Sequence, residues 1–132
     1  MDQRIICIVE DDEATRSSLA ALTRATGFIA KAYRSAEEFL DCLGYVGPCC
    51  IISDIQMPGL SGIDLKQRLT ELNCDVPVIM ITARADERLH KQAMAAGAFC
   101  LLRKPFKSNE LIECVNRAIA EGSDRSGVSR VS

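Results

Sequence analysis

The sequence contains no tryptophan and only one histidine, His90. That histidine has no serine, cysteine or second histidine at a suitable spacing, which argues against nucleophilic catalysis and against a zinc site. No apolar run approaches the ~20 residues that a membrane-spanning helix needs. The first residues lead into a predicted strand without the hydrophobic stretch of a signal peptide. We therefore expect a cytoplasmic protein that makes no membrane contact.

An excess of charge of one sign is also missing. The net charge is -2 and the isoelectric point is near 5.4. A chain with this balance has no general electrostatic attraction to nucleic acid or to anionic lipid. We expect contact with DNA only through a possible C-terminal output domain beyond residue 132.

The Cys-x-x-Cys motif is absent, although the chain has seven cysteines. An odd number of cysteines within mostly apolar runs argues against a disulfide framework. We predict that they act as small buried apolar side chains in a reducing compartment. They are Cys7, Cys42, Cys49, Cys50, Cys74, Cys100 and Cys114.

The length of 132 residues, 48% of them apolar, suits one domain with a single core. Strand patterns alternate with helix patterns along this length. The strands are predicted at residues 4–9, 28–33, 49–54, 78–82 and 98–102, and the helices at 13–26, 35–43, 61–73, 86–95 and from 108 or 109 onward. Ser35, with Glu38 three residues later, and Ser61 have the patterns of helix N-caps. This order predicts an α/β fold, a doubly wound parallel sheet with helices on both faces. Residues 1–121 form the predicted domain, and residues 122–132 are predicted to be a disordered tail or the start of a linker.

The stretch from residue 50 to residue 59 gives the strongest functional signal. It begins with a short apolar strand and delivers one carboxylate, Asp54, to the end of that strand. Pro58 and Gly59 cannot continue the strand, so a tight turn must follow the acid. Ligands of open α/β sheets bind outside the carboxyl ends of the strands, and Asp54 is predicted to lie at such a place.

Polar residues follow the other strands in the same way. Acidic Asp11 and Asp12 follow the first strand, Thr82 ends the fourth, and Lys104 follows the fifth. Clustered carboxylates repel one another unless a cation neutralises them, so they predict Mg²⁺ or another divalent ion such as Mn²⁺ or Ca²⁺. An ammonium and a hydroxyl are suited to hold phosphoryl oxygens. The remaining carboxylate, Asp54, is the predicted nucleophile, and its product would be an acyl phosphate.

Several motifs resemble those of one known family. They are residues 9–12 (Val-Glu-Asp-Asp), 54–59 (Asp-Ile-Gln-Met-Pro-Gly) with Gly62, 81–83 (Ile-Thr-Ala), 96–98 (Ala-Gly-Ala) and 104–106 (Lys-Pro-Phe). In order and spacing they resemble the receiver domains of two-component response regulators over roughly residues 4–120. The motifs look most similar to those of receivers that precede a helix-turn-helix domain in nitrogen-fixation and degradative-pathway regulators. The resemblance implies a flavodoxin-like sheet with strand order 2-1-3-4-5.

The resemblance also implies roles for individual residues. Asp54 would accept a phosphoryl group from a sensor histidine kinase. Asp11 and Asp12 would bind the metal, with Asp12 the more direct ligand, together with Asp54 and the backbone carbonyl of Gln56. Thr82 would move toward the phosphoryl group, and Lys104 would pair with it. Pro105 would support the geometry that places Lys104, through a peptide bond that is commonly cis in the family. The domain would be no enzyme beyond its own phosphotransfer and slow dephosphorylation.

The switch residue departs from the family pattern. An aromatic residue usually lies three positions before the lysine, and here that position is Leu101. Phe99 lies two residues earlier, and strand alternation predicts that it points to the same face but is displaced along the strand. Two alternatives follow: Leu101 executes the switch with a smaller steric signal, or Phe99 substitutes in part. Phosphorylation is expected to change the surface of the fourth helix, fifth strand and last helix. That surface would mediate homodimerisation or contact a transcription-regulating output domain.

Two other functions compete with this interpretation. A phosphatase of the haloacid-dehalogenase kind also uses a strand-end aspartate and Mg²⁺, but it places a second acid where this chain has Gln56. An interaction module that works without phosphorylation would not need the acids, Thr82 and Lys104 together. Phosphorylation with Mg²⁺ and acetyl phosphate would distinguish the three.

Overall fold

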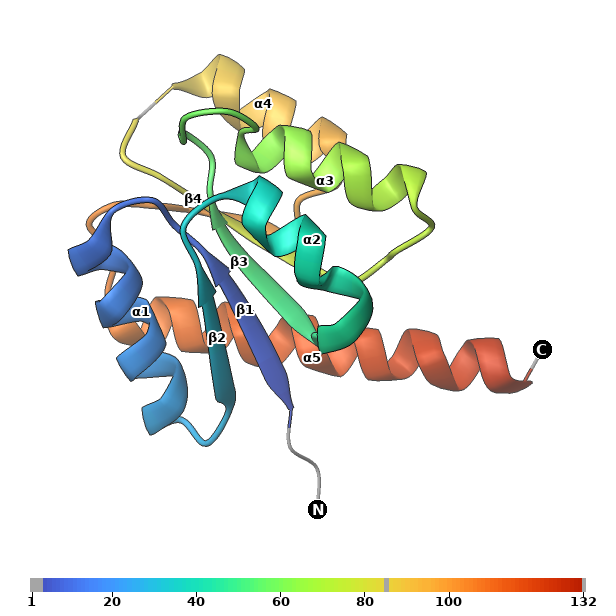
Figure 1. Ribbon diagram of the computed structural model, residues 1–132. Helices are drawn as coiled ribbons and strands as arrows, with labels where there is room; N and C mark the ends of the chain where they lie inside the picture. The colour runs from blue at the N-terminus through green and yellow to red at the C-terminus, as the bar shows by residue number, and fades with distance from the viewer. Residues whose placement is uncertain (1–3, 85, 132) are drawn as a thin grey trace.

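Strand and helix alternate from end to end in the computed structural model of the protein (Figure 1), which describes residues 4–84 and 86–131. The strands are β1 (Ile5–Val9), β2 (Ile29–Tyr33), β3 (Cys50–Asp54), β4 (Val78–Thr82) and β5 (Cys100–Arg103). The helices are α1 (Glu13–Ala25), α2 (Ala36–Val46), α3 (Gly62–Glu71), α4 (Glu87–Ala96) and α5 (Ser108–Val131).

The strands form one parallel sheet in the order β2-β1-β3-β4-β5, which confirms the predicted doubly wound, flavodoxin-like fold. Every residue of β3 and β4 is buried, because helices cover both faces of the sheet. The core on one face joins the sheet to α1 and α5, and the core on the other face joins it to α2, α3 and α4. The continuous apolar runs in the sequence therefore correspond to two-sided burial.

Side-chain caps determine where the helices begin. Ser35 caps α2, and Ser61 caps α3 in a reciprocal capping box with Asp64, as the sequence predicted for both serines. Asp86 caps α4 by accepting hydrogen bonds from two backbone N–H groups of its first turn. These caps set the start of each helix close to the carboxyl edge of the sheet.

Helix α4 has little buried surface of its own. Ala93 is its single buried residue within the described chain, and Leu89 packs against the core only in part. This matches the weak apolar pattern in the sequence. A helix held by so little buried area can shift at a small cost in free energy.

Helix α5 is longer than the sequence predicted. Its backbone is helical over 24 residues, from Ser108 to Val131. The predicted irregular tail from residue 122 is thus helical up to residue 131, and residue 132 lies outside the described part. Glycine and serine lower helix propensity without forbidding a helix, and this segment has no proline to end one. That the segment leads to an output domain stays a prediction.

All seven cysteines are free thiols. Cys7, Cys50 and Cys114 are buried and the other four are partly buried. Burial raises the pKa of Cys7 to about 12 and raises that of Cys50 as well. Buried neutral thiols of this kind are poor nucleophiles, which agrees with a packing role.

Within the described residues, no helix is long and apolar enough to span a membrane.

Candidate phosphorylation site

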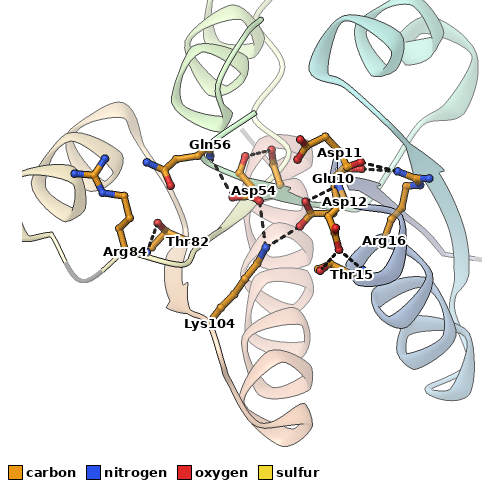
Figure 2. Close-up of polar contacts among 11 residues, drawn as sticks. Glu10, Asp11, Asp12, Thr15, Arg16, Asp54, Gln56, Thr82, Arg84 and Lys104 are labelled. Atoms are coloured by element: carbon orange, nitrogen blue, oxygen red, sulfur yellow. Dashed lines mark hydrogen bonds and ion pairs between the residues drawn. The ribbon is translucent and has the colours of Figure 1, made fainter. Parts of the chain in front are cut away.

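The carboxyl ends of the parallel strands bring the predicted site residues to one edge of the sheet (Figure 2). Asp54 is the last residue of β3 and Thr82 the last of β4. Lys104 directly follows β5, and its side chain points toward Asp54 in Figure 2. The carboxylate, the hydroxyl and the ammonium therefore lie at the same edge of the sheet.

Lys104 joins two acids. Its Nζ donates hydrogen bonds to Asp54 Oδ2 at 3.2 Å and to Glu10 Oε1 at 3.1 Å. Burial lowers the pKa of Lys104, but the hydrogen bonds and attraction of the two carboxylates outweigh this and raise it overall. The lysine thus remains a cation. The bond between Lys104 and Pro105 is cis, as the resemblance implied.

Glu10 is a site residue that the sequence reasoning did not single out. Its side chain is almost fully buried, and desolvation is the main cause that raises its pKa to about 7, with repulsion from Asp54 contributing. The backbone N–H of Asp12 donates to its Oε2 at 3.1 Å, which favours the charged form. Its position immediately after the buried strand β1 was the available signal, because such a residue ends beside Asp54.

A second acid completes the cluster. Oxygens of Glu10, Asp11 and Asp54 all lie within 4.8 Å of one another, and they form the one such group of potential metal ligands among the described residues. Arg16 donates to the backbone carbonyls of Glu10, at 3.0 Å, and Asp11, at 3.3 Å, and so fixes the loop that carries both acids. Carboxylate oxygens at this spacing are the hard ligands that Mg²⁺ takes.

Asp12 does not join this cluster, contrary to the expectation that it is the more direct ligand. Its Oδ2 accepts a hydrogen bond from the backbone N–H of Thr15 at 2.9 Å and from the Thr15 hydroxyl at 2.7 Å. These hydrogen bonds lower the pKa of Asp12 and make it the N-cap of α1. Acidic residues after β1 do lie at the site, but they are Glu10 and Asp11, one position earlier in the chain than the predicted pair Asp11 and Asp12.

This difference leads to a first prediction. Asp12→Ala should reduce the free energy of unfolding, because α1 loses its cap. Asp12→Asn should have almost no effect on stability, since asparagine caps equally well. Chemical denaturation followed by circular dichroism measures both variants. Calorimetric Mg²⁺ titration should give both variants nearly the wild-type affinity, whereas a large loss of affinity in Asp12→Asn would restore Asp12 as a ligand.

The remaining groups surround Asp54. The backbone N–H of Gln56 donates to Asp54 Oδ1 at 3.1 Å. Thr82 is buried, and its hydroxyl oxygen accepts from the backbone N–H of Arg84 at 3.1 Å. That interaction uses an oxygen lone pair, which leaves the hydroxyl proton available as a donor. Asp54 therefore has a cation and a backbone donor in direct contact and a hydroxyl on the neighbouring strand.

Comparisons with known proteins agree with this geometry. The family model for the response regulator receiver domain matches residues 6–116. The chain belongs to this family. Receiver domains are the signalling domains of two-component response regulators rather than enzymes.

Individual relatives add detail. The transcriptional regulatory protein FixJ of Rhizobium meliloti is 36% identical over 118 residues, which cover 89% of this chain and 58% of that protein. The response regulator protein TmoT of Ectopseudomonas mendocina is 34% identical over 117 residues, which cover 89% of this chain and 53% of TmoT. The chain thus spans about half the length of the curated relatives it matches.

Solved structures give the same result. The crystal structure of FixJ-N superposes with a TM-score of 0.84 at 36% identity and covers 91% of this chain and 96% of that one. Full-length FixJ from B. japonicum superposes with a TM-score of 0.88 at 32% identity, covering 96% of this chain and 63% of that one. These likenesses agree with the resemblance seen in the sequence to receivers of nitrogen-fixation regulators.

The receiver's expected switch residues lie on opposite faces of the sheet. Leu101 packs against the core formed with α2, α3 and α4. Phe99 packs against the core formed with α1 and α5, where the guanidinium of Arg117 lies 5.9 Å from its ring centre. Strand alternation does not relate the two, because β5 begins only at Cys100. Phe99 therefore cannot substitute for Leu101 in the way predicted.

Proposed function

We propose that this receiver domain accepts a phosphoryl group on Asp54 from the phosphohistidine of a sensor histidine kinase. The observation that carries the proposal is the contact of Asp54 with Lys104 beside the acids Glu10 and Asp11. A strand-end carboxylate held between a cation and a group of potential metal ligands suits attack on phosphorus. In that step an Asp54 oxygen forms a bond to phosphorus as the bond from phosphorus to the histidine nitrogen breaks.

The acids fit a divalent cation. Glu10, Asp11 and Asp54 bring hard oxygen donors within 4.8 Å of one another, and a dense negative charge of this kind needs neutralisation. We assign the Mg²⁺ site to these acids and to the backbone carbonyl of Gln56, and Mn²⁺ or Ca²⁺ would suit the same donors. When bound, the ion would offset the charge that develops on the phosphoryl oxygens.

The protein's own groups do the remaining work. Lys104 binds a phosphoryl oxygen as a point charge, and it already contacts the attacking carboxylate. The Thr82 hydroxyl donates to a second oxygen once it turns away from the Arg84 backbone. The Gln56 N–H orients the Asp54 carboxylate for attack. Arg84 and Gln56 lie at the rim of the site, where they would tune hydrolysis of the acyl phosphate.

The output is a changed surface. The phosphoryl group brings about -1.5 to -2 of charge, and the movement of Thr82 toward it pulls on the segment that leads to α4. Leu101 stands at the position where the family usually has an aromatic residue, and it would execute the switch with a smaller side chain. The surface of α4, β5 and α5 then favours homodimerisation or release of a transcription-regulating domain. DNA would be contacted only by such a further domain, in the cytoplasm.

One assay tests the phosphotransfer. The protein is incubated with Mg²⁺ and acetyl phosphate, and intact mass and peptide mapping follow the modification. We expect one phosphoryl group per chain, on Asp54. Sustained turnover would instead indicate a phosphatase of the haloacid-dehalogenase kind. No modification, and no response to beryllofluoride, would indicate an interaction module that works without phosphorylation.

A further inference from the structure

The loop between β3 and α3 carries Gln56, whose carbonyl belongs to the proposed metal site. Its base is held by backbone contacts. The N–H of Gly62 donates to the carbonyl of Ile55 at 2.9 Å. A Cβ at residue 62 would lie only 2.6 Å from the carbonyl oxygen of Asp54, so the two ends of the loop are in direct contact. The base of the loop is therefore fixed by the fold.

The tip of the same loop has a different anchor. Glu37, in the first turn of α2, accepts a hydrogen bond on Oε2 from the backbone N–H of Leu60 at 3.1 Å. The two residues are 23 positions apart in the sequence. Gly59 adopts a positive φ of 80°, and a Cβ there would overlap the Glu37 carboxylate. The carboxylate thus lies directly against the backbone of the loop tip.

Glu37 is well placed to act as a rigid anchor. Phe39, two residues on, is fully buried and contacts Tyr33 edge to face, which fixes α2 against the sheet. Ser35 caps the same helix, so its first turn is held at both the backbone and the core. The Glu37 side chain is exposed, so it adds little to the core, and its contact with the β3–α3 loop is the hydrogen bond from Leu60.

We propose that Glu37 is a positioning residue for the metal site, which holds the tip of the β3–α3 loop and thereby the Gln56 carbonyl. This inference rests on the proposed function of Asp54 and its neighbours. The hydrogen bond between Leu60 and Glu37 uses none of the proposed metal ligands, so it can order the loop before the ion binds. A loop that is ordered before Mg²⁺ binds strengthens Mg²⁺ affinity, because binding then carries no entropy cost for ordering the loop. Loss of the anchor should weaken Mg²⁺ affinity without disturbing the acids themselves.

Three variants separate this role from simple support of the helix. Glu37→Ala removes the acceptor, and Glu37→Asp keeps a charge at the helix N-terminus but is too short to reach Leu60. Glu37→Gln keeps both the length and an acceptor oxygen. Support of α2 through its dipole predicts that aspartate restores function and glutamine does not. A positioning role predicts the reverse. Asp41→Asn, an exposed acid on the same helix, serves as the matched control.

Two measurements are made on each variant. Amide hydrogen exchange at Leu60 is measured in the metal-free protein, and Mg²⁺ affinity is measured by calorimetric titration. We expect faster exchange at Leu60 and roughly threefold to tenfold weaker Mg²⁺ binding in Glu37→Ala and Glu37→Asp. Glu37→Gln and Asp41→Asn should resemble the wild type in both measurements.

The outcomes are distinguishable. Unchanged Leu60 exchange in Glu37→Ala, or faster exchange with wild-type Mg²⁺ affinity, would overturn the positioning role. Rescue by aspartate and not by glutamine would do so too. Failure of the wild type to bind Mg²⁺ at all would count against the proposed function itself. The exchange measurement would still show in that case whether Glu37 anchors the loop.

Discussion

Lys104→Met should slow the modification of Asp54 by acetyl phosphate about 10²–10³-fold, the usual effect of losing one donor aimed at developing charge. The lysine contacts Asp54 and Glu10 together. Without it, the two carboxylates face each other and Glu10 takes up a proton more readily. The rate is measured from the intact mass over time at fixed Mg²⁺.

Two further variants make the result specific. Lys107→Met removes an exposed lysine from the neighbouring turn and should react at the wild-type rate. Lys104→Arg should recover little of the lost rate, because a planar guanidinium does not fit a position built for a compact ammonium. A Lys104→Met protein that is folded and reacts within twofold of the wild type would remove Lys104 from the mechanism.

Asp54→Asn should abolish the modification altogether. The amide is no nucleophile under these conditions, and its oxygen can still accept the hydrogen bond from the Gln56 N–H, so the loop stays in place. Lys104 keeps Glu10 as its partner, and the fold should therefore persist. Mass spectrometry after incubation with acetyl phosphate and Mg²⁺ gives the yield, and circular dichroism checks the fold.

Asp41→Asn is the matched control for loss of one aspartate charge, and it should be modified to the wild-type yield. A phosphoryl group that still appeared on the Asp54→Asn protein, for instance on Asp11, would show that the acceptor is a different acid of the cluster. That result would overturn the assignment while leaving the family membership intact.

The sequence was sufficient for the fold because its signals were local and repeated. Continuous apolar runs gave the buried strands, and the caps at Ser35 and Ser61 gave the starts of two helices. Parallel topology then placed Asp54, Thr82 and Lys104 at one edge without any knowledge of distances. The rule used was that the carboxyl ends of parallel strands lie at the same edge of a sheet.

The sequence did not predict where individual side chains point. Three consecutive acids follow β1, and only the exit angle of the chain decides that Glu10 turns inward while Asp12 caps α1. Phe99 precedes the start of β5, where alternation no longer applies. The length of α5 likewise depends on a segment whose composition neither favours nor forbids a helix.

The small buried area of α4 would set the free-energy scale of the proposed switch. This helix is held by the buried Ala93 and the partly buried Leu89, so it loses little buried apolar area when it moves. Inverting a two-state population from 1:99 to 99:1 takes about 5.5 kcal/mol of differential binding. A few charge-assisted hydrogen bonds to a phosphoryl group can supply a sum of that order. A larger buried apolar face on this helix would raise the free-energy cost of moving it, so under the proposed function the small buried area of α4 would allow phosphorylation of one side chain to change a whole surface.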